Sequence, residues 1–247
     1  MKPRLVIIGF GSFGQYMVKY LRRAFDIVAI DERDISADCQ RLGVTRGDYS
    51  SLAAARIIIA GVPVQGLEDL AARLAGLGEA LEGKVIVDVC SVKVVPGEIL
   101  IPKLPKSAHF ISLHPLFGPV SAPHSIEGRL TVMCPGRVND RVYQRVRRFL
   151  MRSLHLTVVE CDAHEHDQTM AYVQVLTHLI GRALKEVGLP DTSLATTAYA
   201  RMREMMNVLT LDSWPLFVTI AKHNPYSKDV RTRLQTAFDR LNAAIDG

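Results

Sequence analysis

The chain has 247 residues and a formal net charge of +5, and 48% of its residues are hydrophobic and 22% charged. This composition is ordinary for a globular protein and provides for one large domain or two smaller ones. No apolar run approaches the roughly 18 residues of a membrane span, the N-terminus shows no signal peptide, and the four cysteines form no Cys-x-x-Cys pair, so we expect a cytoplasmic protein with reduced thiols and no membrane partner.

The first apolar run, residues 5–8, leads into a Gly-x-Gly-x-x-Gly pattern and then into an amphipathic segment. This order predicts a strand, a tight turn and a helix. The first glycine would allow the turn, the second would let the backbone approach a pyrophosphate, and the third would let the helix pack closely on the strand. The phosphates would lie at the helix N-terminus. The predicted cofactor-binding residues of this turn are Gly9, Gly11, Ser12, Phe13 and Gly14.

A second apolar run, residues 27–30, ends in Asp31. A carboxylate at this place binds the ribose hydroxyls of the adenosine half of a dinucleotide. It would also repel a 2′-phosphate, so we predict NAD rather than NADP as the cofactor, a preference that Arg33 could soften. The alternative is an ordinary βα turn with a solvated acid.

Strand-like and helix-like segments alternate as far as residue 161, which predicts a mostly parallel sheet covered on both faces. We therefore expect a Rossmann-type dinucleotide-binding domain over residues 1–161. Its strands are expected at 4–8, 27–30, 56–60, 84–89, 109–113, 130–134 and 155–160, and its helices near 13–23, 64–75 and 139–152. The last of these helices carries a cluster of arginines without interleaved aromatic residues, which we interpret as a solvated face rather than a nucleic-acid site.

From residue 162 the strand signal stops, which predicts an all-helical domain over 162–247. A capping pattern at residues 162–165 should start a long helix that Gly188 and Pro190 should end. Further helices are expected near 192–210 and 212–223. The last helix has an apolar stripe that needs a partner, so we predict a homodimer formed through this domain. The stripe consists of Val230, Leu234, Phe238, Leu241 and Ile245.

Two polar motifs follow neighbouring strands, at the edge that the glycine turn also marks. Ser91 comes after the strand at 84–89, and His114 directly follows the strand at 109–113. Ligands of open parallel sheets bind beyond these carboxyl ends, so both side chains should face the nicotinamide end of the cofactor. An imidazole there could accept a proton from a substrate hydroxyl, and Ser91 could orient it or bind the same hydroxyl. The alternative for His114 is a structural polar residue before a proline-bounded turn.

A second polar set lies on the long helix. Gln174 and His178 are four residues apart, with Thr177 and Gly181 on nearly the same face and apolar residues around them. Buried polar groups need partners, which a ligand or a neighbouring helix could provide. The segment His164-Glu165-His166-Asp167 looks like a metal cluster, but its adjacent side chains should diverge at a helix start, so we predict no metal site.

In this order and at this spacing, these segments resemble the arogenate/prephenate dehydrogenase family of tyrosine biosynthesis, most closely its plant-type branch. The resemblance covers nearly the whole chain. It is carried by the glycine turn through Gln15 and by residues 88–93, 114–119, 165–167, 177–182 and 212–214.

The resemblance implies oxidative decarboxylation of a cyclohexadienyl acid, in which hydride passes to the nicotinamide and the ring becomes aromatic. His114 would polarise the ring hydroxyl, with Ser91 as its partner. An acid at the position of Asp212 implies a preference for arogenate, because a carboxylate suits an ammonium group; the product would be tyrosine. The predicted substrate-binding residues are Lys93, Gln174, Thr177, His178, Arg201 and Asp212.

The chain also departs from relatives in this family. Many bacterial members carry a second histidine at the position of Gly181, and a carboxylate-binding arginine at the position of Ala200, beside Arg201. Plant members usually prefer NADP, whereas Asp31 predicts NAD.

Three alternatives stay open at this point. The first is a prephenate or dual-substrate dehydrogenase that yields 4-hydroxyphenylpyruvate. The second is a regulator that binds NAD without turnover. The third is a reductase of the 6-phosphogluconate or imine type, for which Lys185 and Lys222 of the helical domain would be the candidate proton donors.

Overall fold

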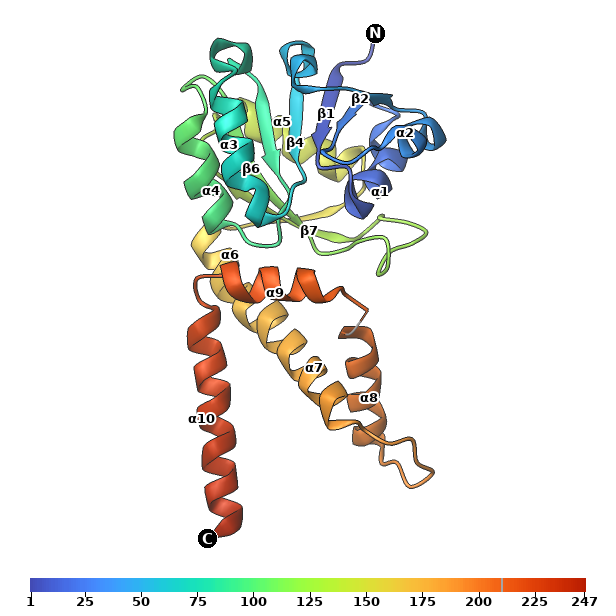
Figure 1. Cartoon of the computed structure of the whole chain (residues 1–247), viewed down its shortest axis with the longest axis vertical. Coiled ribbons are helices and arrows are strands. Elements are labelled where there is room, and N and C mark those ends of the chain that lie inside the picture. Colours follow the sequence, from blue (N-terminus) through green and yellow to red (C-terminus); the bar gives the residue numbers. More distant parts are fainter. Residues whose placement is uncertain (210) are drawn as a thin grey trace. The chain divides into compact units, whose positions relative to one another are not determined.

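A computed structural model describes residues 1–209 and 211–247. The chain forms two compact units, Met1–His166 and Asp167–Gly247. The division falls five residues after the boundary predicted from the sequence, inside helix α6 (Ala163–Met170) rather than before it. Figure 1 shows the elements of both units in sequence colours.

The N-terminal unit contains an eight-stranded sheet with the order β3-β2-β1-β4-β5-β6-β7-β8. All neighbouring strands are parallel except β6 and β7. This is the predicted mostly parallel sheet, and the Rossmann-type fold class is confirmed. The strands are β1 (Arg4–Ile8), β2 (Asp26–Ile30), β3 (Thr45–Arg46), β4 (Ile57–Ala60), β5 (Val85–Asp88), β6 (His109–Pro115), β7 (Leu130–Pro135) and β8 (Thr157–Glu160).

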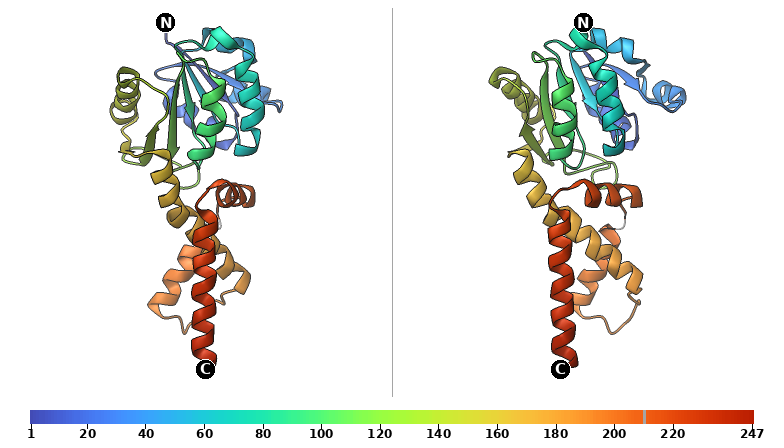
Figure 2. Two further views of the ribbon diagram at one scale, coloured as in Figure 1. Left: turned by 90° about the vertical axis from the view of Figure 1, so that its left-hand side faces the viewer. Right: turned by 60° about the vertical axis from the view of Figure 1, so that its left-hand side comes forward.

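Helices cover both faces of this sheet, as Figures 1 and 2 show. In β1, Leu5 and Ile7 join the core under α1 and α5, whereas Val6 and Ile8 join the core under α3 and α4. Side chains alternate along a strand, so a strand buried on both faces must be apolar throughout. The helices of this unit are α1 (Ser12–Leu21), α2 (Ser36–Leu42), α3 (Leu67–Ala75), α4 (Val94–Leu100) and α5 (Asp140–Arg152), with short 3₁₀ turns at Tyr49–Ala54, Val64–Gly66, Gly78–Leu81 and Ile101–Lys103.

The predicted long helix is present, but it is not uniform. The backbone N–H of Glu165 donates to Asp162 Oδ1 over 2.8 Å and so caps the start of α6. A π-helical segment (Ala171–Leu176) then separates α6 from α7 (Thr177–Val187). Gly188 ends α7 with a φ of +75°, a left-handed conformation that favours glycine.

The C-terminal unit continues with three more helices, α8 (Thr197–Leu209), α9 (Trp214–His223) and α10 (Ser227–Asp246). The predicted helix near 192–210 corresponds to α8, and its position 210 lies outside the described residues. Along α10, Val230 is buried, but Phe238, Leu241 and Ile245 are 50%, 60% and 80% exposed. Over the described residues, no helix combines the length and apolar character that crossing a bilayer requires.

Candidate functional site

The glycine turn after β1 has the geometry that each glycine was predicted to serve. Gly9 has a φ of +89°, and a Cβ atom there would lie 2.5 Å from the Gly61 carbonyl oxygen. A Cβ atom on Gly14 would lie 3.0 Å from the carbonyl oxygen of Gly9 and 3.4 Å from Ile7 Cγ2. At Gly11 a Cβ atom would meet nothing within 4 Å. The turn is therefore closed where the chain packs on itself and open at the position that would approach a pyrophosphate.

The electrostatics of this turn also suit a dinucleotide. Helix α1 begins directly after Gly11, and its first turn contains no acidic residue that would oppose an anion at the helix N-terminus. Asp31 Oδ2 accepts a hydrogen bond from the backbone N–H of Phe10 over 2.7 Å, which fixes the carboxylate beside the turn. The residues present therefore fit the predicted cofactor.

Asp31 is also clamped by Arg33. Arg33 Nε lies 2.9 Å from Asp31 Oδ1, and Arg33 Nη2 lies 3.0 Å from Asp31 Oδ2. These hydrogen bonds lower the pKa of Asp31 to about 2. The carboxylate is thus fully ionised at neutral pH, and a guanidinium group offsets part of its charge.

A buried polar network joins the ends of β5 and β6. Asp88 and Ser112 are register partners in these strands, and the hydroxyl of Ser112 donates to Asp88 Oδ2. The ammonium group of Lys93 binds the same carboxylate oxygen and donates to the carbonyl oxygen of Leu113 over 2.8 Å. Asp88 also accepts the backbone N–H of Cys90 over 2.9 Å. The network secures the backbone just before His114.

Lys93 is fully buried in this network. Lys93 was predicted to bind substrate, but its side chain has no exposed surface and its charge is paired with Asp88. A buried ammonium group requires such a partner. The structure therefore gives Lys93 a role in holding the strand ends together, and its contact with substrate stays a prediction.

His114 lies in β6, on the same face of the sheet as Ser112 because the two are two residues apart. The residue is 4% exposed. Its Nδ1 atom lies 2.9 Å from Nε2 of His166 on α6. Burial lowers the pKa of His114 well below 6.5, with further lowering by His166 and Lys93. The imidazole is therefore neutral at physiological pH, the state in which it can accept a proton.

His166 is the partner of His114 at Nδ1. Ser91 is half-buried in the segment between β5 and α4, and its part in the site stays a prediction. In the sequence His166 is part of the polar segment 164–167 at a helix start, whose adjacent side chains are expected to point in different directions. The run does diverge as predicted, since His164 is exposed while His166 is 1% exposed. Within the described residues, no three His, Cys, Asp or Glu side chains form a group that could hold a metal ion.

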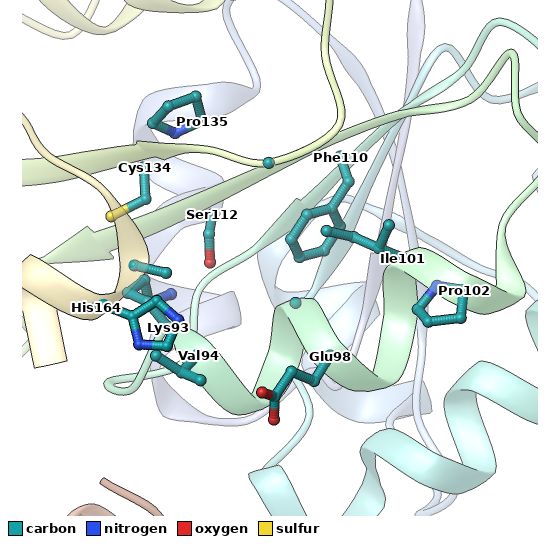
Figure 3. A pocket seen from close by; sticks show the side chains of 13 residues that line it. Lys93, Val94, Glu98, Ile101, Pro102, Phe110, Ser112, Cys134, Pro135 and His164 are labelled. Atoms are coloured by element: carbon teal, nitrogen blue, oxygen red, sulfur yellow. The ribbon is translucent and has the colours of Figure 1, made fainter. Parts of the chain in front are cut away.

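A cavity of about 310 Å³ lies in the N-terminal unit beside α4. Figure 3 shows that apolar side chains such as Phe110 and Ile101 form much of its wall, with Glu98 and His164 among the polar residues. Ser112 and Lys93 also line it, whereas the glycine turn and His114 are not among its described lining residues. The cavity is therefore not the predicted cofactor site.

The C-terminal unit brings some of the predicted substrate-binding residues together. His178 Nε2 lies 3.4 Å from Asp212 Oδ2, and the Asp212 side chain is 44% exposed. Burial lowers the pKa of His178, and the negative charge of Asp212 opposes this effect. Arg182, which was not singled out in the sequence, donates to the Asp212 carbonyl oxygen over 2.7 Å and stacks over the Phe217 ring at 4.8 Å.

The other predicted residues of this unit differ in their surroundings. The hydroxyl of Thr177 donates back to the carbonyl oxygen of Val173 over 2.7 Å, so it is used within its own helix. Gln174 lies in the π-helical segment, and Arg201 is exposed on α8. At Gly181 the neighbouring helix comes close, because Cβ of Leu209 in α8 would lie 2.8 Å from an added Cβ atom.

The strand order, the glycine turn and the acid after β2 define a Rossmann-type dinucleotide-binding domain followed by a helical unit. Comparison with known families agrees. The model of the prephenate dehydrogenase nucleotide-binding domain matches residues 17–154, more than half of the chain, and that of the TYRAAT1-like C-terminal domain matches residues 183–247. The chain therefore belongs to the prephenate dehydrogenase family, as the resemblance in its motifs predicted.

Curated relatives include plant enzymes. The chain is 26% identical to arogenate dehydrogenase 2 (chloroplastic) of Arabidopsis thaliana, over 99% of the chain and 70% of that protein. It is 27% identical to arogenate dehydrogenase 1 (chloroplastic) of the same plant, over 99% of the chain but only 39% of that protein. The chain thus spans well under two thirds of the second relative.

Solved structures share the fold. The crystal structure of Synechocystis arogenate dehydrogenase matches with a TM-score of 0.71 at 20% identity, over 98% of this chain and 92% of that one. The structure of Aquifex aeolicus prephenate dehydrogenase in complex with hydroxyphenyl propionate and NAD+ matches with a TM-score of 0.76 at 17% identity, over 99% of this chain and 91% of that one.

Proposed function

We propose that this protein is an arogenate dehydrogenase, which oxidises and decarboxylates arogenate to tyrosine with NAD as the hydride acceptor. The observation that carries the proposal is a buried, neutral imidazole, His114, in the strand end of a dinucleotide-binding sheet. Family membership and the arogenate dehydrogenases among the relatives support the same activity.

The residues would divide the chemistry as follows. A bound nicotinamide would supply the hydride acceptor. His114 would accept the proton of the ring hydroxyl as the ring carbon that bears this hydroxyl loses its hydride. Ser91 would donate or accept a hydrogen bond at the same hydroxyl. Loss of carbon dioxide then gives an aromatic ring, so the protein needs to supply positioning and one proton acceptor rather than a covalent intermediate.

The preference for arogenate rests on Asp212. Its half-exposed carboxylate is a suitable partner for the ammonium group that distinguishes arogenate from prephenate, and it would repel the carboxylate of the prephenate side chain. Contacts with the rest of the substrate stay predictions for Gln174, Thr177, His178 and Arg201. Of these, Thr177 has its hydroxyl already engaged in its own helix.

The choice of NAD rests on Asp31, whose ionised carboxylate lies beside the glycine turn. A 2′-phosphate would be repelled by this charge, although Arg33 reduces the repulsion. A cytoplasmic location likewise stays a prediction from the sequence.

We further propose a homodimer formed through the helical unit. The supporting observation is the exposed half of the apolar stripe on α10, where Phe238, Leu241 and Ile245 lie open in the single chain. Burying such side chains against a second copy is favourable. Light scattering should give a dimer mass, and a sharp monomer mass would contradict this part of the proposal.

A matrix of two substrates and two cofactors tests the function directly. Cofactor reduction should be fastest with arogenate and NAD. Faster turnover of prephenate would instead indicate the prephenate or dual-substrate alternative. Tight NAD binding without cofactor reduction by either substrate would indicate a regulator. The same matrix run on Asp212→Asn should shift the preference toward prephenate, and an unchanged ratio would remove Asp212 from substrate recognition.

A further inference from the structure

The imidazole of His166 is an unexpected neighbour for a proton-accepting histidine. The rings of His114 and His166 meet edge to face, with centroids 5.0 Å apart and an interplanar angle of 64°. Nδ1 of His114 and Nε2 of His166 are 2.9 Å apart, and the two residues are 4% and 1% exposed. At this distance the two nitrogens share one hydrogen, so one ring donates and the other accepts.

The chemistry proposed for His114 decides which ring donates. Because Nδ1 is turned toward His166, the substrate hydroxyl falls to Nε2 of His114. To accept a proton there, Nε2 must be unprotonated, and a neutral imidazole then carries its hydrogen on Nδ1. Nδ1–H of His114 therefore donates to Nε2 of His166, which must itself be unprotonated at that atom.

We propose that His166 is a positioning residue for the reaction, and that it holds His114 in the Nδ1–H tautomer and accepts the hydrogen bond of the imidazolium that forms when His114 takes the substrate proton. This inference rests on the proposed function of His114. A carboxylate serves this purpose in other enzymes that use a histidine base, whereas here a ring nitrogen of a second histidine does so.

The charges around the pair are consistent with this assignment. Among the groups that act on His114, His166 from α6 and Lys93 from the segment before α4 both disfavour a positive charge on its ring. A positive charge on His114 would lie near the buried ammonium group of Lys93, which is paired with Asp88. The resting His114 ring is therefore neutral, and it gains a positive charge only when it accepts the substrate proton.

The backbone explains why His166 can hold this position. Its helix α6 is capped by Asp162, whose side chain accepts the N–H of Glu165. His166 N donates to the Asp162 carbonyl oxygen over 3.0 Å in the same first turn. The ring that faces His114 is thus carried by the capped first turn of the helix.

Two substitutions at position 166 separate positioning from packing. His166→Gln keeps an acceptor near the place of Nε2, whereas His166→Leu keeps bulk without an acceptor. His164→Leu, an exposed histidine of the same helix, is the matched control. We expect His166→Leu to lower kcat by about 100-fold or more, the size of a lost base contribution, with KM and the NAD dissociation constant within about threefold of the parent. The kcat of His166→Gln should be at least about tenfold higher than that of His166→Leu. His164→Leu should have the kcat of the parent protein.

Nitrogen-15 NMR of labelled histidine gives a readout that packing alone would not move. The parent protein and His166→Gln should show His114 as the Nδ1–H tautomer, and His166→Leu should show the Nε2–H tautomer or a mixture. An Nε2–H tautomer in the parent protein would overturn the proposal even if a variant failed to fold. Equal kcat in the parent and a folded His166→Leu would also overturn it.

The two proposals fail in different ways. If His114→Asn retains turnover, the function proposed for His114 is wrong, whatever His166 does. If His114→Asn abolishes turnover while His166→Leu retains both turnover and the tautomer, the role of His166 alone is wrong.

Discussion

The ammonium nitrogen of Lys93 lies 2.5 Å from the carboxylate of Asp88, and neither side chain has any exposed surface. Lys93 also binds the carbonyl oxygen of Leu113, the residue before His114. The pair therefore connects the end of β5 to the backbone that presents the imidazole. We therefore expect the pair to help position His114.

Breaking this pair from one side should be strongly destabilising. Lys93→Met keeps the length of the side chain but leaves the Asp88 carboxylate buried without its cation, which typically costs about 3–5 kcal/mol. The double variant Asp88→Asn, Lys93→Met removes both charges and should recover much of the loss. Urea unfolding of the three proteins measures this, and a single variant within 1 kcal/mol of the parent would show that the pair contributes little.

The depressed pKa of His114 predicts a pH dependence for stability and activity. The unfolded histidine takes up a proton near pH 6.5, whereas burial keeps the folded residue neutral to lower pH. The folded state then binds fewer protons, so its contribution to stability is complete above pH 6.5 and is lost as the pH falls below it. Turnover should hold at pH 6.5 and decline only at lower pH.

His114→Asn isolates this contribution, because the other histidines are common to both proteins. The free energy of unfolding should fall more steeply for the parent than for His114→Asn between pH 6.5 and pH 5. Parallel curves would mean that His114 titrates normally in the folded protein.

Two helical glycines provide a matched test of packing. An added Cβ atom at Gly181 would lie 2.8 Å from Leu209 Cβ and 2.9 Å from Leu209 Cδ1, whereas at Gly97 of α4 the nearest atom is Ile101 Cδ1 at 3.8 Å. Gly181→Ala should therefore destabilise by about 1–3 kcal/mol through overpacking. Gly97→Ala should be neutral or stabilising by up to about 1 kcal/mol, since alanine favours helix. Thermal unfolding of both variants decides, and equal effects would contradict the close contact at Leu209.

Arg33 should govern how strictly the protein rejects NADP. Its guanidinium group offsets the charge of Asp31, so Arg33→Ala leaves the carboxylate unopposed toward a 2′-phosphate. We expect the ratio of kcat/KM for NAD over NADP to rise by about tenfold, equivalent to about 1.4 kcal/mol. Arg41→Ala is the control, because Arg41 binds Asp38 in a similar exposed pair. A ratio that stays the same in Arg33→Ala, or that moves equally in both variants, would remove the Asp31 pair from cofactor choice.

Much of the fold could be predicted from the sequence because the strands of a doubly covered sheet are continuous apolar runs. All seven expected strands have counterparts in the structure. The eighth, the two-residue β3 (Thr45–Arg46), is not an apolar run and was not predicted. Helices α2 and α4 were missed because each has only seven residues, too few to show a periodic face. The π-helical segment within the long helix leaves no mark in the spacing of the apolar residues.

The site was predictable at the level of motifs and less so at the level of contacts. His114 and Asp31 stand where strands end, and sequence position alone identifies such residues. His166 could not be found this way, since its pairing with His114 joins segments 52 positions apart. The sequence pointed to His166 only as part of the segment 165–167, which resembles the family as a whole. The pairing of Lys93 with Asp88 could not be predicted, because a lysine after a strand looks the same whether its partner is a ligand or a buried aspartate.

Hydride transfer by His114→Asn tests the central claim most directly. Asparagine is similar in size but cannot accept the proton of the ring hydroxyl as a base. Stopped-flow reduction of NAD with arogenate should slow by about 100-fold or more, while the dissociation constant of NAD measured by calorimetry stays unchanged. Turnover within a few-fold of the parent protein would show that another group accepts the proton.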